Sequence, residues 1–145
     1  MIKVVIIDDD IFVSGALKTT LESSGDITIP ATGCDGKEAL ELYKKYRPDV
    51  LLMDIRMKEV SGLDASAAVL KEFPKANILL LTTFSDDEYI VQALKLGARG
   101  YLLKQDYASL LPALRAVHSG QTVFGHEIVS KIPDLLHSGS SFRYE

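Results

Sequence analysis

The sequence predicts an α/β fold, a doubly wound parallel sheet of five strands with helices on both faces. Four short, continuous apolar runs end in polar residues, at positions 3–7, 50–53, 78–81 and 101–103. Such runs are typical of strands that are buried on both faces of a parallel sheet. Segments with helical spacing separate them, so that strand and helix alternate along the chain. This alternation implies right-handed crossovers and helices on both sides of the sheet.

Each element has its own local signal. Residues 27–31 form a weaker fifth strand, in which Pro30 indicates an edge position because proline cannot donate to a strand ladder. The predicted helices are residues 12–24, 35–46, 63–73, 85–96 and 107–119. Each helix is closed by a glycine or a proline, namely Gly25, Pro48, Pro74, Gly97 and Gly120. Asp35 with Glu38, and Ser85 with Glu88, have the spacing of capping boxes that open two of these helices.

The regular alternation stops at Gly120. A short helix is expected over residues 126–136, and Ser138-Gly-Ser-Ser141 has the composition of a linker. We therefore expect one compact domain over residues 1–120. Residues 121–145 would form a short helix and a linker that leads towards a further domain.

Composition narrows the functional class. The chain has 145 residues, of which 47% are apolar and 25% charged, as in an ordinary globular domain with a core. Its net charge of −4 and lack of a basic patch do not favour nucleic-acid binding by this chain itself. The single cysteine, Cys34, fits a reducing compartment and is expected to be half-buried and structural. No apolar run is long enough to span a bilayer, so we expect a cytoplasmic protein without a membrane partner.

Polar groups follow four of the predicted strands where each strand ends. They are Asp8, Asp9 and Asp10 after the first run, Asp54 after 50–53, Thr82 and Thr83 after 78–81, and Lys104 after 101–103. In an open parallel sheet, ligands bind outside the carboxyl ends of the strands. A hydrophobic sheet does not need polar groups at these ends. The sequence therefore predicts an acidic functional crevice at this edge.

The residue types in this crevice indicate phosphoryl chemistry with Mg²⁺. Clustered carboxylates repel one another unless a hard cation neutralises them, and oxygen ligands suit Mg²⁺. A metal ion, a hydroxyl and a lysine together can hold a phosphoryl group, and aspartate can itself be the nucleophile. Taken singly, an aspartate at a strand end is often only a helix cap. For Asp10 we expect the cap, at the start of the first helix.

Several motifs together resemble a known family. They are Val5-Ile-Ile-Asp-Asp9, Leu52-Met-Asp-Ile-Arg-Met57, Gly62-Leu63, Leu80-Leu-Thr-Thr-Phe84, Asp86-Asp-Glu-Tyr89, Ala93-Leu-Lys-Leu-Gly-Ala98 and Gly100-Tyr-Leu-Leu-Lys104. Over residues 1 to about 120 the chain resembles the receiver domain of two-component response regulators, which has a flavodoxin-like (CheY-like) (βα)5 fold. The stretch from Thr82 to Tyr89 and the closing residues 119–124 resemble the NarL/FixJ (LuxR-type) subgroup.

The resemblance implies a role for each acidic residue. Asp54 would be the phosphoacceptor. Asp9 and Asp54, with the backbone carbonyl of Arg56, would ligate Mg²⁺, and Asp8 would act through a metal-bound water. Backbone amides of Arg56 and Thr83 would complete the cage around the phosphoryl oxygens.

The resemblance also assigns the switch. Thr82 would donate its hydroxyl to a phosphoryl oxygen, and Lys104 would pair with phosphorylated Asp54. Tyr101 occupies the position of an aromatic residue that turns inward when Thr82 moves. Because Thr82 and Thr83 are adjacent, an error of one residue in the strand end would exchange their roles; we favour Thr82, which directly follows the apolar run.

Two positions depart from the family pattern. Lys58 stands where a proline is usual, which predicts a looser loop after Asp54. Gln105 replaces a proline that many receivers carry after the lysine, although this subgroup often lacks it. The departure removes the usual candidate for a cis peptide bond.

The implied function is that of a signalling switch rather than a turnover enzyme. The implied partners are a sensor histidine kinase and, on phosphorylation, a second copy of the chain. DNA would be bound only through a helix-turn-helix domain that is not in this chain. Its own chemistry would be limited to Mg²⁺-dependent phosphorylation of Asp54 and slow hydrolysis.

Three alternatives compete with this interpretation. Haloacid-dehalogenase-like phosphatases use an Asp-x-Asp motif like Asp8 to Asp10, but they continue with Gly-Thr, whereas this chain continues with Ile11 and Phe12. Residues 33–37 superficially resemble a phosphate loop, but the spacing of the glycines is wrong and no hydroxyl residue follows the lysine. A binding module with a degenerate acidic pocket is the third alternative.

Overall fold

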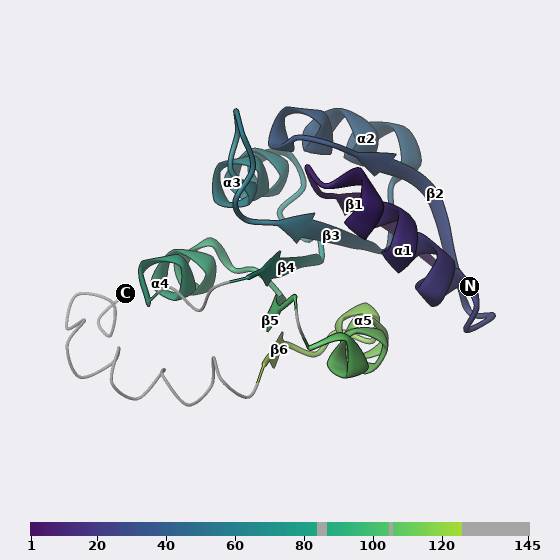
Figure 1. Ribbon diagram of the computed structural model, residues 1–145. Helices are drawn as coiled ribbons and strands as arrows, with labels where there is room; N and C mark the ends of the chain where they lie inside the picture. Colours follow the sequence, from purple (N-terminus) through teal and green to yellow (C-terminus); the bar gives the residue numbers. More distant parts are fainter. Residues whose placement is uncertain (84–86, 105, 126–145) are drawn as a thin grey trace.

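The predicted doubly wound parallel sheet is confirmed. The computed structural model describes residues 1–83, 87–104 and 106–125. The strands are β1 (Ile2–Ile7), β2 (Ile27–Gly33), β3 (Val50–Asp54), β4 (Ile78–Thr82), β5 (Gly100–Leu103) and β6 (Val123–Phe124). The helices are α1 (Ile11–Glu22), α2 (Ala39–Tyr46), α3 (Gly62–Glu72), α4 (Asp87–Leu96) and α5 (Leu110–His118). All strand pairs are parallel, in the order β2-β1-β3-β4-β5-β6 (Figure 1).

The sheet has one short strand more than the five predicted. Val123 pairs with Gly100 and Phe124 with Tyr101, so β6 extends the sheet beyond β5 and past residue 120. Two residues give no periodic signal in a sequence, which is why this strand was not predicted. The helix expected over residues 126–136, the linker at 138–141, the cap at Ser85 and the departure at Gln105 lie outside the described residues.

Figure 1 shows helices on both faces of the sheet, and one apolar layer packs between the sheet and the helices on each face. Alternate strand residues enter opposite layers, because successive side chains of a strand point to opposite faces. One layer packs the sheet against α2, α3 and α4, with Val5, Ile7, Leu51, Met53, Leu80, Val69, Ile90 and Tyr101 among its buried members. The other packs it against α1 and α5, with Val4, Ile6, Leu17, Leu52, Leu79, Leu102, Leu114 and Val117. Within the described ranges, none of the helices is both long enough and apolar enough to cross a membrane.

The cap of α1 shows where local prediction works. Asp10 caps α1 as expected, since its carboxylate accepts hydrogen bonds from the backbone of Phe12 and Val13 at 3.0 and 3.3 Å.

The start of the next helix differs from the predicted capping box. Asp35 accepts from the backbone N–H of Lys37, and a 3-10 turn over Gly36–Glu38 precedes α2. Glu38 accepts from the backbone N–H of Cys34 at 2.9 Å, one residue before the position that a capping box requires. Cys34 is exposed rather than half-buried, because it lies in this turn beyond the end of β2.

The chain passes very close to itself after β3. The backbone N–H of Gly62 donates to the carbonyl of Ile55 at 2.7 Å, which brings the first residue of α3 against the end of β3. A Cβ atom at position 62 would lie 2.1 Å from the carbonyl oxygen of Asp54, far inside van der Waals contact. Only glycine fits there without moving the backbone of Asp54.

We therefore expect Gly62→Ala to lower the free energy of unfolding by about 2–3 kcal/mol, because the new methyl group overpacks a backbone contact. Gly15→Ala is the matched control, since Gly15 lies within α1 with open space around its Cβ position. That change should raise the free energy of unfolding by about 0.5–1 kcal/mol through helix propensity. Urea denaturation of both variants measures the difference, and equal effects would contradict the prediction.

Candidate functional site

The carboxyl ends of four neighbouring strands bring the predicted site residues to one edge of the sheet. Ile7 pairs with Met53, so Asp8 and Asp54 follow at the same level of β1 and β3. Asp54 pairs with Leu81, and Thr82 pairs with Leu103. The side chains that end these strands therefore lie along one line, from β1 across β3 and β4 to β5. This register confirms the sequence argument that polar groups at strand ends would meet.

Three carboxylates form a compact cluster at this edge. Asp8, Asp9 and Asp54 each offer an oxygen, and these oxygens all lie within 4.8 Å of one another. Asp8 and Asp54 are buried, with 1% and 5% of their surface exposed, whereas Asp9 is exposed. A donor set made only of oxygens, with one side open to solvent, fits a hard divalent cation such as Mg²⁺. The residues present thus fit the metal that the sequence predicted.

Lys104 bridges two of the three carboxylates. Its Nζ lies 2.7 Å from Asp8 Oδ2 and 3.1 Å from Asp54 Oδ2, and only 13% of its side chain is exposed. Burial by itself would lower the pKa of Lys104, but the hydrogen bond to Asp8 and the charge of Asp54 outweigh it and raise the pKa. The ammonium group is therefore a fixed positive charge between the ends of β1 and β3.

Asp54 is difficult to ionise in this setting. The pKa of Asp54 is raised from 3.8 to about 6. Burial is the largest cause, the negative charges of Asp8 and Asp9 act in the same direction, and Lys104 opposes them. A carboxylate that is desolvated and surrounded by like charges gains strongly from a cation. The electrostatics therefore favour metal binding at Asp54.

The neighbouring acidic residues help to position Asp8. The backbone N–H of Asp10 donates to Asp8 Oδ1 at 2.9 Å, while the Asp10 side chain caps α1. Asp8 therefore has one carboxylate oxygen on this backbone amide and the other on Lys104. This arrangement fixes the carboxylate that the resemblance assigns to a metal-bound water.

Thr82 and Tyr101 occupy the buried side of the edge. Thr82 is fully buried at the end of β4, and its carbonyl accepts the backbone N–H of Lys104 at 2.7 Å. Thr83 is exposed, which supports Thr82 as the inward residue of the pair. The Tyr101 ring is also fully buried and stacks on Phe124, with ring centroids 6.3 Å apart and planes 13° from parallel. The predicted switch residue therefore points inward in this structure.

The loop after β3 carries the remaining predicted ligand. Arg56 lies two residues beyond Asp54, with its side chain exposed. Sequence reasoning treated Asp35 only as a helix cap, yet its carboxylate also accepts the backbone N–H groups of Glu59 and Val60 in this loop. No local sequence pattern predicts these two hydrogen bonds, because Glu59 and Val60 are 24 and 25 residues away from Asp35 in the sequence.

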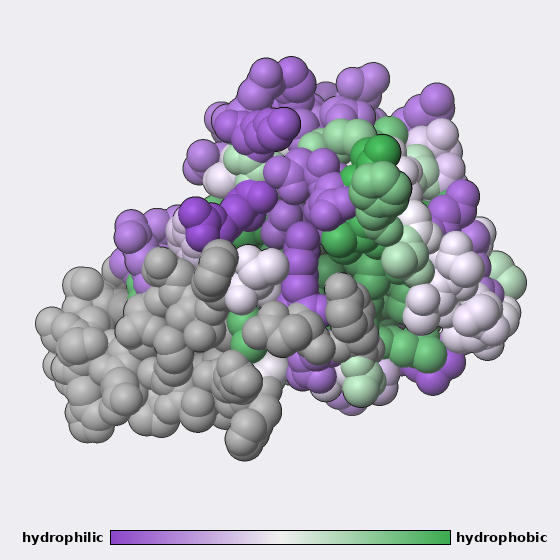
Figure 2. Space-filling model, viewed as in Figure 1, coloured by the Kyte–Doolittle hydropathy of each residue, from purple (hydrophilic) through white to green (hydrophobic). Residues whose placement is uncertain are grey.

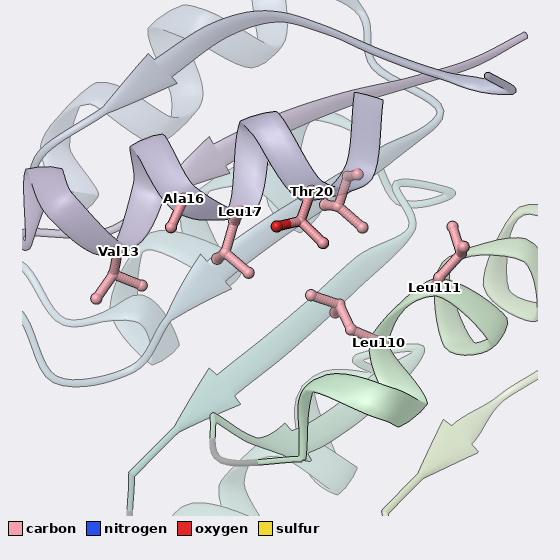
Figure 3. Close-up of a pocket in the computed structure, with 7 residues that line it drawn as sticks. Val13, Ala16, Leu17, Thr20, Leu110 and Leu111 are labelled. Carbon is pink, nitrogen blue, oxygen red and sulfur yellow. The ribbon is translucent and has the colours of Figure 1, made fainter. Parts of the chain in front are cut away.

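An apolar groove lies on the opposite side of the sheet from α3 and α4. It is a groove of about 300 Å³ between α1 and α5, and Figure 3 shows the side chains that face into it. They are Val13, Ala16, Leu17, Thr20, Leu21, Leu110 and Leu111. In Figure 2 an apolar band covers α1, where Ile11 and Phe12 are 62% and 83% exposed. A single hydroxyl among aliphatic groups offers no reactive chemistry, so this groove is not the candidate reaction site.

Known proteins match both the sequence and the structure. Residues 4–115, which include every predicted site residue, match the family described as response regulator receiver domain. Oxygen regulatory protein NreC of Staphylococcus aureus (strain USA300) is 38% identical over 141 residues, or 96% of this chain. The chain spans 65% of the length of NreC.

Solved structures agree with these matches. A two-component response regulator of the LuxR family from Aurantimonas sp. SI85-9A1 has a TM-score of 0.88 at 25% identity, covering 92% of this chain and 96% of its own. A DNA-binding response regulator of the LuxR family from Staphylococcus aureus has a TM-score of 0.77 at 25% identity, covering 81% and 99%.

The raised pKa of Asp54 predicts how stability depends on pH without metal. Since the folded carboxyl titrates near 6 and the unfolded one near 3.8, folded protein holds more protons between these values. This group therefore costs stability as pH rises from about 4 to 7. The two pKa values correspond to roughly 3 kcal/mol, which screening in the open crevice reduces to about 1–2 kcal/mol.

Asp54→Asn removes this titration. The free energy of unfolding of the variant minus that of the wild type should therefore increase by about 1–2 kcal/mol between pH 4 and pH 7, and this difference is the advantage of the variant. Saturating Mg²⁺ should shrink the advantage, because the cation stabilises the ionised wild type. Urea denaturation at several pH values, with and without Mg²⁺, measures both effects. An advantage that does not change with pH would contradict the prediction.

Proposed function

The chain belongs to the response regulator receiver domain family, and we propose that it is the phosphorylation-activated receiver of a two-component system with Asp54 as phosphoacceptor. The observation that carries this proposal is the cluster of Asp8, Asp9 and Asp54 bridged by Lys104 at the carboxyl edge of the sheet. These are the residues that the resemblance assigns to the acidic pocket.

Asp54 is the nucleophile of the proposed transfer. One of its carboxylate oxygens attacks the phosphorus of a phosphohistidine on a sensor kinase. A P–O bond forms to Asp54, the P–N bond breaks, and the electron pair of that bond returns to the imidazole ring. The product is an aspartyl phosphate, an intermediate that carboxylate nucleophiles form in other phosphoryl transfers.

Asp8, Asp9, Asp54 and the backbone carbonyl of Arg56 would hold Mg²⁺, with Asp8 acting through a water. When bound, the ion neutralises the carboxylates and the charge that develops on the transferred group. The contribution of the chain is to hold these oxygens in place: Asp8 is fixed by the Asp10 amide, and Asp54 by its position at the end of β3.

The phosphoryl group would then rearrange the buried side of the edge. Lys104, already 3.1 Å from Asp54, would pair with a phosphoryl oxygen, and the Thr82 hydroxyl would donate to another. Movement of Thr82 would change the space available to Tyr101, which lies on the neighbouring strand. Phosphorylation would thus bias a two-state surface that includes α4, β5 and α5.

The proposed output is regulation of transcription by the whole protein. The two solved structures are LuxR-family response regulators, one of them described as DNA-binding. The chain spans 65% of the length of NreC. DNA would be bound by a helix-turn-helix domain outside this chain. Phosphorylation-promoted dimerisation would place two such domains on paired half-sites.

Incubation with Mg²⁺ and acetyl phosphate, followed by intact-mass spectrometry, tests the proposal. We expect one added phosphate in the wild type and none without metal or in Asp54→Ala. A phosphate that persists in Asp54→Ala but is lost in Asp8→Ala would move the nucleophile to β1 and support a phosphatase-like mechanism. No phosphate under any condition would favour a degenerate binding module.

Dimerisation can be tested on the same phosphorylated protein. We expect sedimentation velocity to show a larger dimer fraction after phosphorylation, and an unchanged fraction would contradict this expectation. Two exposed positions distinguish the two candidate faces: Ala16→Arg places a charge in the groove between α1 and α5, and Gln92→Arg places one on α4. The variant that loses the dimer identifies the face.

A further inference from the structure

The turn between β2 and α2 holds the loop between β3 and α3. Asp35 in this turn is only 9% exposed, and its carboxylate accepts three backbone hydrogen bonds. Lys37 N–H donates at 3.0 Å from within the turn, and Glu59 N–H and Val60 N–H donate at 3.1 and 3.3 Å from the loop. Hydrogen bonds to an ionised carboxylate are stronger than those between neutral groups. Asp35 is therefore the main polar link between two segments that are distant in the sequence.

The backbones of the two segments are also in direct contact. A Cβ atom on Gly36 would lie 2.4 Å from the carbonyl oxygen of Val60 and 3.1 Å from that of Ser61. The loop therefore rests on the backbone of the turn. An ion pair between Lys37 and Glu59 lies above this contact, but both side chains are more than half exposed, so the pair contributes little.

The same loop is anchored at its other end by the Gly62 amide on the carbonyl of Ile55. Residues 56–58 lie between these two anchors, and the half-buried side chain of Met57 packs against the core. Lys58 lacks the fixed φ angle that a proline would give this segment. The geometry of residues 56–58 therefore depends in part on how firmly residues 59–60 are held.

We propose that Asp35 is a positioning residue for phosphoryl transfer onto Asp54. It holds the loop so that the backbone of Arg56 keeps one position relative to the Asp54 carboxylate. This inference rests on the proposed function, in which the Arg56 carbonyl is a ligand of Mg²⁺. Asp35 acts through the loop backbone, in the way that groups behind a metal ligand orient that ligand.

Asp35→Ala tests the role through metal binding, without any phosphoryl transfer. Isothermal titration calorimetry of folded protein with Mg²⁺ should show an affinity weaker than wild type by about tenfold or more, as for other residues that orient metal ligands. Hydrogen exchange of the backbone amides at 56–60 should become faster in the same variant. Asp35→Asn keeps one carbonyl acceptor, so it should show a smaller loss, and it carries the test if Asp35→Ala does not fold.

Asp26→Ala is the matched control. Asp26 precedes β2 at the opposite end of the strand, where it accepts two hydrogen bonds from Arg115 and one from Ser24. This variant loses a comparable set of bonds far from the crevice, so it should bind Mg²⁺ as the wild type does. If loss of stability alone weakened Mg²⁺ binding, Asp35→Ala and Asp26→Ala would show the same reduced affinity.

Two failures can be told apart. Wild-type protein that binds no Mg²⁺ and takes no phosphate on Asp54 would overturn the proposed function, and the role of Asp35 with it. Normal wild-type binding, together with an Asp35→Ala affinity within twofold of it or equal to that of Asp26→Ala, would overturn the positioning role alone.

Discussion

The acidic edge depends on one cation within the protein itself, the Lys104 ammonium between Asp8 and Asp54. Two buried carboxylates at the ends of adjacent strands would repel each other strongly without a compensating charge. Lys104 provides that charge from β5, across the intervening strand β4. The bridge lets a sheet with an apolar core end in carboxylates, but one ammonium group cannot neutralise three carboxylates. The remaining negative charge favours a divalent cation at this edge.

Strand alternation connects this edge to the rest of the domain. Leu102 enters the layer under α1 and α5, whereas Tyr101 and Leu103 enter the layer under α4. Lys104, which directly follows β5, lies at the crevice. A rearrangement at Asp54, the proposed phosphoacceptor, would therefore reach one helical face through a single strand. The ring of Tyr101 also stacks on Phe124, so a movement of Tyr101 would reach β6 as well.

The sequence predicted most of what depends on local pattern, although the turn from Asp35 to Glu38 differs from the predicted capping box. The apolar runs predicted the strands and their carboxyl ends, and the register then brought Asp8, Asp54 and Lys104 together as expected. What could not be predicted depends on tertiary placement. The two-residue β6 forms only because β5 offers an open edge, and the hydrogen bonds of Asp35 to residues 59 and 60 exist only once two loops are neighbours. The close approach of Gly62 to Asp54 is of the same kind.

The exposed thiol of Cys34 has a practical consequence for spectroscopy. It is the single cysteine of the chain, and it stands one residue before Asp35 in the turn that touches the β3–α3 loop. A maleimide fluorophore or a nitroxide attached there would report from beside that loop without any engineered substitution. The native chain therefore already carries a unique labelling position from which motion next to the acidic edge can be followed in real time.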